Sequence, residues 1–472
     1  MRNLPKILLK KVFILCTGLI TLFGARQSYG HGGLGHIQVT AWAAENLPQG
    51  ELRQFLAHPE VFNILLFGAA YPDFGYYPSV QEETLALEIG QYSHWAPFIE
   101  DFVEWIRIHH PPPWTTLESQ KRVAFLMGCA AHGFQDEVFD TLFLPQVRYH
   151  DNSGQKEADS GTDGFLAMDA LVNTIPEGDI PVDVLLALYN KPGLFDKEVT
   201  EELLLSWVDT MTTLYVGEGV GSAISQIAAN QYLNVLKWTR ENYMEADIPG
   251  SLRAEIFPTA RYLEALWKRL HGEYSDKDVV VFSYPESPRR LRSHLSKSPD
   301  SWVSFILGSG INHQTVDSFW KDSSGENVGF SRAGVGWGGK TYARIMKLSP
   351  KADLIPGAHY SVVLKSDATG TGDKIWKIDY ATEFQVACGA ENPNDCPDLG
   401  EFPQPKIDGH EAFKSEWPSP DPIVEEEVPD NSGCSNLRGN LTPLLCLVVL
   451  MGAVRRNAKP LPTPINKDLF PK

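Results

Sequence analysis

The chain has 472 residues, of which 59 are acidic and 41 basic, giving a formal net charge of −18. This balance disfavours a protein that binds nucleic acid along its backbone, because such binding depends on lysine and arginine neutralising phosphates. Hydrophobic residues make up 43% of the chain, so ordinary globular cores can form, and the length predicts two to three domains.

Residues 1–30 have the pattern of a secretory signal peptide. A basic segment precedes the apolar run Val12–Phe23, and small residues stand just before His31. Cleavage there would expose an α-amine on His31, five residues before His36. A free amine, its own carbonyl and a nearby imidazole can together chelate a metal ion. A trimmed terminus that begins with histidine by chance is the alternative. The pattern predicts an exported protein.

Residues 31–275 are predicted to form one helical domain. Apolar residues recur at three- and four-residue spacing, and prolines cluster between these segments. The spacing predicts helices over Ile99–His109, Arg122–Phe139, Asp163–Asn173, Val182–Tyr189, Glu201–Tyr215, Ser222–Tyr243 and Ser251–His271.

The pattern changes to short runs of β-branched and aromatic residues over residues 277–390. Turn-forming residues separate these runs, which is typical of a β-sandwich. A Leu-x-Pro-Gly-x-x-Tyr turn within Leu348–Leu364 and a closing strand at Thr382–Phe384 resemble bacterial immunoglobulin-like modules. That resemblance implies a spacer or binding module rather than chemistry. The expected runs are Val279–Phe282, Trp302–Leu307, Lys340–Lys347, His359–Leu364 and Tyr380–Ala387.

Cysteine usage fits an exported chain. Cys388 and Cys396 flank a loop rich in Asn, Asp and Pro, which predicts a local disulfide in an oxidising compartment. Cys129 lies in an apolar stretch and is expected to be buried and free.

The C-terminal part differs from both of these regions. Residues 397–433 are acidic and rich in proline, the composition of a flexible linker. Residues 434–456 carry a cysteine motif, an apolar segment and an arginine pair, and resemble bacterial C-terminal sorting tags of the Gly-Cys type. The apolar segment is shorter than the roughly 20 residues of a membrane span, and residues 457–472 depart from the tag pattern. Anchoring at the cell surface and an unanchored apolar tail are the two alternatives.

Histidines and aspartates with the chemistry of metal ligands recur in the predicted helical domain. His132, Asp136 and Asp140 lie four residues apart, so on a helix they point from one face. Their neighbours are largely apolar, and burying an imidazole and a carboxylate there is costly unless they are paired or bound to metal. An ordinary surface pair is the alternative. Asp159 and Asp163 repeat the four-residue step, with loop and helix-capping roles as their alternative.

Several segments in this half resemble, in order and spacing, the zinc-dependent phospholipase C superfamily, and within it the catalytic domains that cleave glycosylphosphatidylinositol lipids. The segments are Gly35–Val39, Ala70–Asp73, Ser93–Phe98, Pro112–Trp114 and Val123–His132. The resemblance implies an all-α catalytic domain. The expected fold is therefore a multi-domain chain in which this helical domain is followed by an immunoglobulin-like β-sandwich.

The resemblance also implies metal ligands, residue by residue. The amine and carbonyl of His31 would hold one zinc ion together with His36 and a bridging Asp136. A second zinc ion would use His94, His132 and the same Asp136.

The third zinc site of the family is altered in this chain. The family expects histidines near Asp140 and Asp159 and an acid at Asp163, whereas all three are aspartates here. Three carboxylates favour Ca²⁺, Mg²⁺ or Mn²⁺ relative to Zn²⁺. A shifted alignment that recruits His150, and an empty third site, are the alternatives.

The resemblance implies a secreted metal-dependent phosphodiesterase that hydrolyses phospholipids or glycosylphosphatidylinositol-type lipids with two to three zinc ions. Asp73 matches the family's aspartate that acts as general base or, in related nucleases, as a ligand. The partners would be the lipid substrate and a membrane surface. A single-strand nuclease of the same superfamily and a cell-surface binding protein with altered catalysis are the alternative functions. The acidic balance weighs against nucleic acid, and the sequence indicates no oligomeric state.

Overall fold

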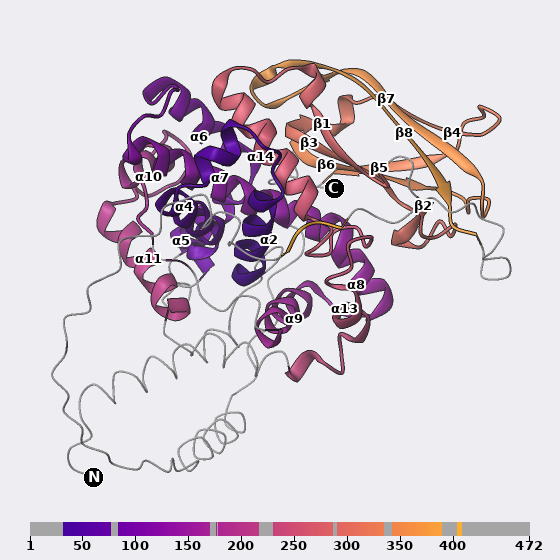
Figure 1. Cartoon of the computed structure of the whole chain (residues 1–472), viewed down its shortest axis with the longest axis horizontal. Helices are drawn as coiled ribbons and strands as arrows, with labels where there is room; N and C mark the ends of the chain where they lie inside the picture. Colours follow the sequence, from indigo (N-terminus) through magenta and orange to yellow (C-terminus); the bar gives the residue numbers. More distant parts are fainter. Residues whose placement is uncertain are drawn as a thin grey trace, which may run out of the picture. The chain divides into compact units, whose positions relative to one another are not determined.

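Figure 1 shows the computed structural model, which describes residues 32–76, 84–169, 176, 178–216, 230–286, 290–334, 342–388 and 404–407. These residues belong to one compact unit, Met1–Trp417. The predicted signal peptide, most of the linker 397–433, and the segments 434–456 and 457–472 lie outside the described residues. Among the residues that are described, no helix combines the length and hydropathy that a membrane span needs.

The first half of the described chain is helical, as the apolar spacing predicts. Its first helices are α2 (Gly33–Glu45), α3 (Glu51–Leu56), α4 (Pro59–Ala70), α5 (Thr84–Ser93), α6 (Ala96–His109), α7 (Leu117–Val138) and α8 (Leu144–His150). They are followed by α9 (Gln155–Met168), α10 (Val182–Tyr189), α11 (Glu201–Val216), α13 (Lys237–Asn242) and α14 (Ile256–His271). A 3₁₀ turn, η1 (Tyr71–Tyr76), follows α4, and a π-helical turn, η3 (Phe139–Phe143), follows α7.

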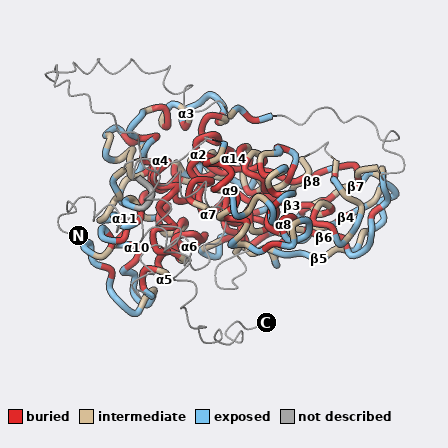
Figure 2. The backbone as a smooth tube through the Cα atoms, turned by 90° about the horizontal axis from the view of Figure 1, so that it is seen from below, coloured by how far each residue is buried: buried red, intermediate tan, exposed pale blue. Residues whose placement is uncertain are grey.

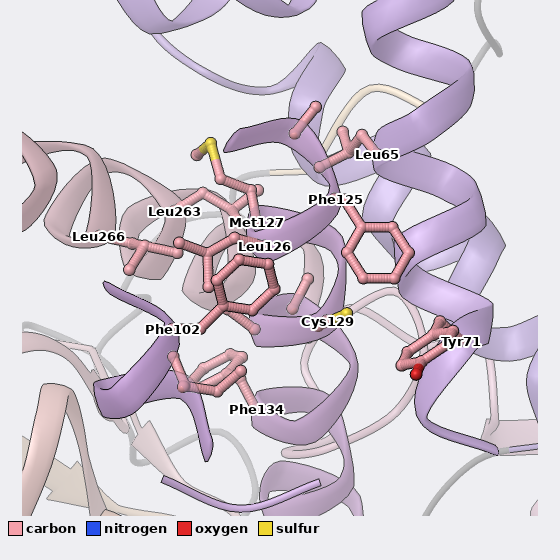
Figure 3. Close-up of a cluster of buried hydrophobic side chains, with 14 of the residues drawn as sticks. Leu65, Tyr71, Phe102, Phe125, Leu126, Met127, Cys129, Phe134, Leu263 and Leu266 are labelled. Carbon is pink, nitrogen blue, oxygen red and sulfur yellow. The ribbon is translucent and has the colours of Figure 1, made fainter. Parts of the chain in front are cut away.

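Helix α7 is the long buried helix of this half. The Thr116 hydroxyl caps its start by accepting a hydrogen bond from the Ser119 N–H. Every residue from Val123 to Val138 is buried. Helix α4 packs closely against it because Gly68 and Gly128 lie at the contact, where a Cβ would overlap the opposing backbone. Figure 3 shows the apolar side chains that surround α7, contributed by α4, α6 and α14 as well as by α7 itself.

Helix α2 is enclosed on all sides. All of its 13 residues are buried (Figure 2), and it contacts α4, α7, α9 and α14. The described segment 404–407 lies at its C-terminal end, where the Trp42 indole N–H donates to the carbonyl of Ile407 at 3.1 Å. Asn46 and Lys406 exchange two further hydrogen bonds there. These contacts fix the helix that carries His36.

The second half of the described chain forms two four-stranded sheets. The first has the order β1-β3-β6-β5 and the second β2-β8-β7-β4. All pairs are antiparallel except β2 with β8, which is parallel. Both sheets contribute to a second apolar core. The strands are β1 (Val280–Tyr284), β2 (Arg290–Leu291), β3 (Val303–Asn312), β4 (Ser318–Asp322), β5 (Phe330–Gly334), β6 (Tyr342–Pro350), β7 (His359–Thr369) and β8 (Ile375–Val386).

The expected fold, an all-α catalytic domain followed by a separate immunoglobulin-like β-sandwich, is wrong. The core of the helical half also contains Phe282, Tyr284, Ile306 and Ile345 from the strands. Strands β1 and β3 contact α14, and β6 contacts α7, so the first sheet is covered on both faces. An alternating apolar pattern predicts a strand but not the element that covers its outer face. The strand order does not establish an immunoglobulin-like arrangement.

Candidate metal centre

Five side chains from four parts of the helical half converge at one buried point. His36 lies on α2, Asp73 on the turn η1, His94 between α5 and α6, and His132 and Asp136 one turn apart on α7. None of them is more than 5% exposed. The sequence predicts all five as site residues, and the structure brings them together.

The Asp136 carboxylate lies in the middle of this group. Its Oδ1 is 3.0 Å from Nε2 of His36, and its Oδ2 is 3.4 Å from Nε2 of His94 and 3.5 Å from Nε2 of His132. Oδ1 of Asp73 is 3.4 Å from Nε2 of His94 and 3.8 Å from Nε2 of His132. Two sets of side chains have ligand atoms close enough to share an ion, and we call each set a metal-sized group. They are His36, Asp73 and His132, and His94, His132 and Asp136.

The imidazoles of His94 and His132 present Nε2 to this group because Nδ1 is engaged elsewhere. Nδ1 of His94 lies 2.6 Å from the carbonyl oxygen of Gly90, and Nδ1 of His132 lies 2.6 Å from that of Ala69. A carbonyl can only accept, so Nδ1 carries the proton and Nε2 carries the lone pair in the neutral ring. Metal-binding histidines are oriented by this kind of hydrogen bond.

His36 is oriented by a side-chain relay instead. Its Nδ1 lies 2.9 Å from Oε1 of Gln135, whose amide nitrogen donates to the Thr40 hydroxyl at 3.0 Å. In this arrangement the amide oxygen of Gln135 faces His36, and Oε1 accepts the Nδ1–H. All three rings therefore point Nε2 at the Asp136 carboxylate.

Burial and like charges disfavour ionised carboxyl groups in this centre. Burial raises the pKa of Asp136 well above its usual range; His94 opposes that shift and Asp73 adds to it. Burial lowers the pKa of His94, but hydrogen bonding to Asp73 and the charge of Asp136 outweigh it and hold that pKa above its ordinary value. A bound cation would favour the carboxylate and the neutral imidazole.

The donor set fits a metal ion. The two oxygens of Asp136 accept no hydrogen bond within the described part of the chain, although three imidazole nitrogens face them. Buried carboxylates are normally paired or bound to metal. Imidazole nitrogen with carboxylate oxygen is a usual ligand set for zinc and for other first-row transition metals. The buried His and Asp groups could therefore hold a metal ion.

The three other predicted aspartates lie nearby but do not join these sets. Asp140 falls in the π turn η3, beyond the regular register of α7, and accepts a hydrogen bond from the Gln155 amide at 3.0 Å. Asp159 on α9 is 4% exposed, and neither of its oxygens accepts a hydrogen bond from a described residue. Burial, Asp140 and Asp136 raise the pKa of Asp159 well above its usual range. None of the three belongs to a metal-sized group among the described residues.

Asp163 contacts the beginning of α2. Its carboxylate accepts hydrogen bonds from the N–H groups of Leu34 at 3.2 Å and Gly35 at 2.9 Å, where a helix favours negative charge. Burial raises the pKa of Asp163 to about 6 against the opposing effect of these hydrogen bonds. The aspartate thus ties α9 to the helix that carries His36.

Two predicted residues lie outside the described part of the chain. They are His31, the predicted N-terminal ligand, and Cys396. Cys388 is disulfide-bonded, while the pairing with Cys396 stays a prediction. Cys129 is buried and free, as predicted.

Three charged residues at the centre were not among the site residues predicted from the sequence. Glu137 follows Asp136 on α7 and pairs with Arg344 of β6, and both are fully buried. Glu255 is also buried, and burial together with the charges of Asp136 and Asp140 raises its pKa well above the usual range. For Glu137 and Arg344 the sequence signal was a charged residue inside an apolar helix or strand, since such residues are rarely buried without a partner.

Comparison with known proteins relates part of the chain to one group of enzymes. It is 30% identical over 141 residues to phosphatidylinositol-glycan-specific phospholipase D of Bos taurus, covering 28% of this chain and 16% of that protein. It is 26% identical over 208 residues to the Homo sapiens protein, covering 40% and 24%. The chain thus spans a quarter or less of these relatives. No family model matches it. The similarity is a loose relation to a phospholipid-directed hydrolase.

Solved structures add no argument about the fold. CopC from Methylosinus trichosporium OB3b is 18% identical, with a TM-score of 0.19, over 23% of this chain and 92% of that chain. The N-terminal part of the bacterial S-layer protein SbsC is 11% identical, with a TM-score of 0.17, over 70% of this chain and 79% of that chain. Both TM-scores are too low to support a shared fold.

Proposed function

We propose that this protein is a metal-dependent phosphodiesterase of the zinc-dependent phospholipase C type, acting on phospholipids or glycosylphosphatidylinositol-type lipids. The observation that carries the proposal is the convergence of three oriented Nε2 atoms, from His36, His94 and His132, on the buried carboxylate of Asp136. The similarity to phosphatidylinositol-glycan-specific phospholipase D supports the lipid phosphodiester as the substrate.

Zinc is the proposed ion for the histidine-rich groups, because imidazole nitrogens dominate their donor sets. The neighbouring aspartates Asp140, Asp159 and Asp163 would favour a harder cation such as Ca²⁺, Mg²⁺ or Mn²⁺. When bound, a divalent cation supplies positive charge to phosphate oxygens and lowers the pKa of a water molecule.

Asp73 is the proposed general base. Its carboxylate oxygen Oδ1 lies beside two histidines of the centre, 3.4 Å from Nε2 of His94 and 3.8 Å from Nε2 of His132. From there it can accept the proton of a water molecule that attacks phosphorus and hold it until the leaving oxygen takes it. The Tyr76 ring lies 5.3 Å from that of His94, which provides an apolar wall beside the reacting group.

The proposed setting is outside the cell, at a membrane surface. Removal of residues 1–30 would free the amine of His31, five residues before His36 in the sequence, and the proposed role of this amine is to complete a metal site that the precursor lacks. N-terminal sequencing of protein isolated from the producing cells tests this point, since a mature chain that does not begin at His31 contradicts it.

Metal analysis and substrate assays of the mature protein test the function. We expect a transition metal to copurify. We also expect release of the headgroup from phosphatidylcholine or glycosylphosphatidylinositol vesicles, abolished by chelator and restored by zinc. Single-stranded DNA is the control substrate and should not be cut. A protein with no bound transition metal, inert towards every phosphodiester after zinc addition, would refute the proposal.

A further inference from the structure

Arg344 is a buried cation whose side chain extends from strand β6 into the helical half. It is 1% exposed. Its backbone N–H donates to Oε2 of Glu137 at 2.9 Å, and its Nε donates to Oε1 at 3.0 Å. The guanidinium also lies 5.8 Å from the ring centroid of Tyr262 on α14. The pair with Glu137 neutralises both charges and leaves further guanidinium donors free to bind other groups.

Those remaining donors reach backbone oxygens at the metal centre. One terminal nitrogen of Arg344 donates to the carbonyl of His94 at 3.0 Å and to the carbonyl of Gly133 at 2.7 Å. His94 is itself a candidate ligand. Gly133 and Glu137 each follow a candidate ligand directly along α7. Through two backbone carbonyls and the Glu137 carboxylate, Arg344 thus binds at or beside all three members of the group His94, His132 and Asp136.

The approach of His94 to α7 is unusually close at this point. A Cβ at Gly133 would overlap the carbonyl oxygen of His94 and would come within 3.1 Å of the Arg344 guanidinium. Two carbonyl oxygens therefore accept from the same nitrogen. Without a cation there, the two carbonyl dipoles would repel, and the backbone of the segment that carries His94 would lose its hydrogen-bonded link through Arg344 to α7.

We infer that Arg344 is a positioning residue for the metal centre. Through Glu137 and the two carbonyls it fixes the distance between the His94 segment and α7, and so holds Nε2 of His94 near Asp136. The two-sheet region therefore completes the centre, although it supplies none of the proposed ligands. The inference rests on the metal-binding part of the proposed function and not on the reaction.

Cobalt binding to the full chain tests this role. The protein is treated with chelator and titrated with Co²⁺ alone, and the visible absorption of the ion reports affinity and coordination geometry. The variants are R344K, R344M and the charge-balanced double variant E137M/R344M. The matched control is R269M, which breaks a largely buried ion pair between Arg269 and Glu100 that joins α14 to α6 and includes no residue of the centre. Circular dichroism checks that each variant is folded.

We expect R344M and E137M/R344M to bind Co²⁺ roughly 10- to 100-fold more weakly, the range typical of removing a group that orients a metal ligand, and to shift its visible spectrum. R344K should fall between them and the wild type, because an ammonium group replaces only part of the contacts. R269M should match the wild type. Any folded Arg344 variant with wild-type affinity and spectrum overturns the inference, and R344K decides it if the apolar variants do not fold. A wild type that binds Co²⁺ but hydrolyses no phosphodiester refutes the proposed reaction alone.

Discussion

The imidazole rings of His36 and His132 stack with their centroids 3.6 Å apart, although they belong to helices α2 and α7. Both side chains are fully buried. Two cationic rings at this distance would repel strongly, and water cannot screen that repulsion there. The stack therefore disfavours protonation of both rings at once, and the neutral imidazole is the form that binds metal.

The first prediction concerns His132, which belongs to both metal-sized groups. Replacing His132 by alanine should remove at least one bound ion per chain, because each group loses a nitrogen ligand. Chelator should then no longer lower the thermal midpoint as it does in the wild type, since stabilisation by a bound ion disappears with its binding. Elemental analysis and thermal unfolding measure these effects.

The control for this prediction is His271→Ala. His271 lies at the end of α14, where Nδ1 bonds the carbonyl of Trp267 at 2.9 Å, and it takes no part in the centre. It should keep the wild-type metal content. An unchanged metal content in the His132 variant would show that the centre does not bind metal through this residue.

The second prediction concerns Asp73. As a general base, Asp73→Asn should lower kcat by roughly 10²- to 10⁴-fold while the group of His94, His132 and Asp136 still holds its ion. Steady-state kinetics on lipid vesicles and elemental analysis of the same preparation separate the two effects. Equal losses of metal and turnover would assign Asp73 as a ligand instead, and an unchanged kcat would exclude both roles.

Local sequence patterns predicted much of the helical half. The expected segment Val182–Tyr189 coincides with α10, and Glu201–Tyr215 differs from α11 by one residue. The sequence predicts a helix that begins at Asp163, whereas α9 already begins at Gln155. The prediction missed the residues from Gln155 to Asp163 because they are mostly polar and show no apolar spacing. Strands β4 and β5 were not predicted for a similar reason, since each has at most one buried residue.

For the candidate site, too, local patterns predicted some contacts and could not predict others. His132 and Asp136 share a helix face, so spacing alone places them together, and the family resemblance supplied His36, Asp73 and His94. The contact between Arg344 and Gly133 spans 211 residues. No periodicity relates two positions so far apart, and only the packing of β6 against α7 brings them together.

The third prediction concerns pH and Asp163. Its pKa is raised from 3.8 to about 6 by burial, so the folded metal-free chain binds a proton that the unfolded chain releases. The stability from this proton is fully present below pH 3.8 and is lost as pH rises through about 6. In chelator, the free energy of unfolding of the wild type relative to Asp163→Asn should therefore fall over this range, by at most about 3 kcal/mol.

Denaturant titrations of both proteins across this pH range measure the difference. If Asp163 binds a cation, saturating Mn²⁺ or Ca²⁺ should abolish the fall, because the ion favours the carboxylate. A difference that does not change with pH would mean that Asp163 only caps α2.

The fourth prediction concerns Gly133, where α7 meets the His94 carbonyl. Gly133→Ala places a methyl group on that oxygen, between backbone atoms that cannot move aside as a flexible side chain would. Overpacking of this kind costs roughly 1–3 kcal/mol, and it pushes the His94 segment away from α7. We therefore expect lower stability in denaturant and weaker Co²⁺ binding in the same protein.

The matched control is Gly50→Ala at the start of α3, where a Cβ meets nothing within 4 Å and the backbone is extended. It should change neither quantity. A Gly133 variant that loses stability but binds Co²⁺ as the wild type does would show that the His94 carbonyl can move without moving its imidazole.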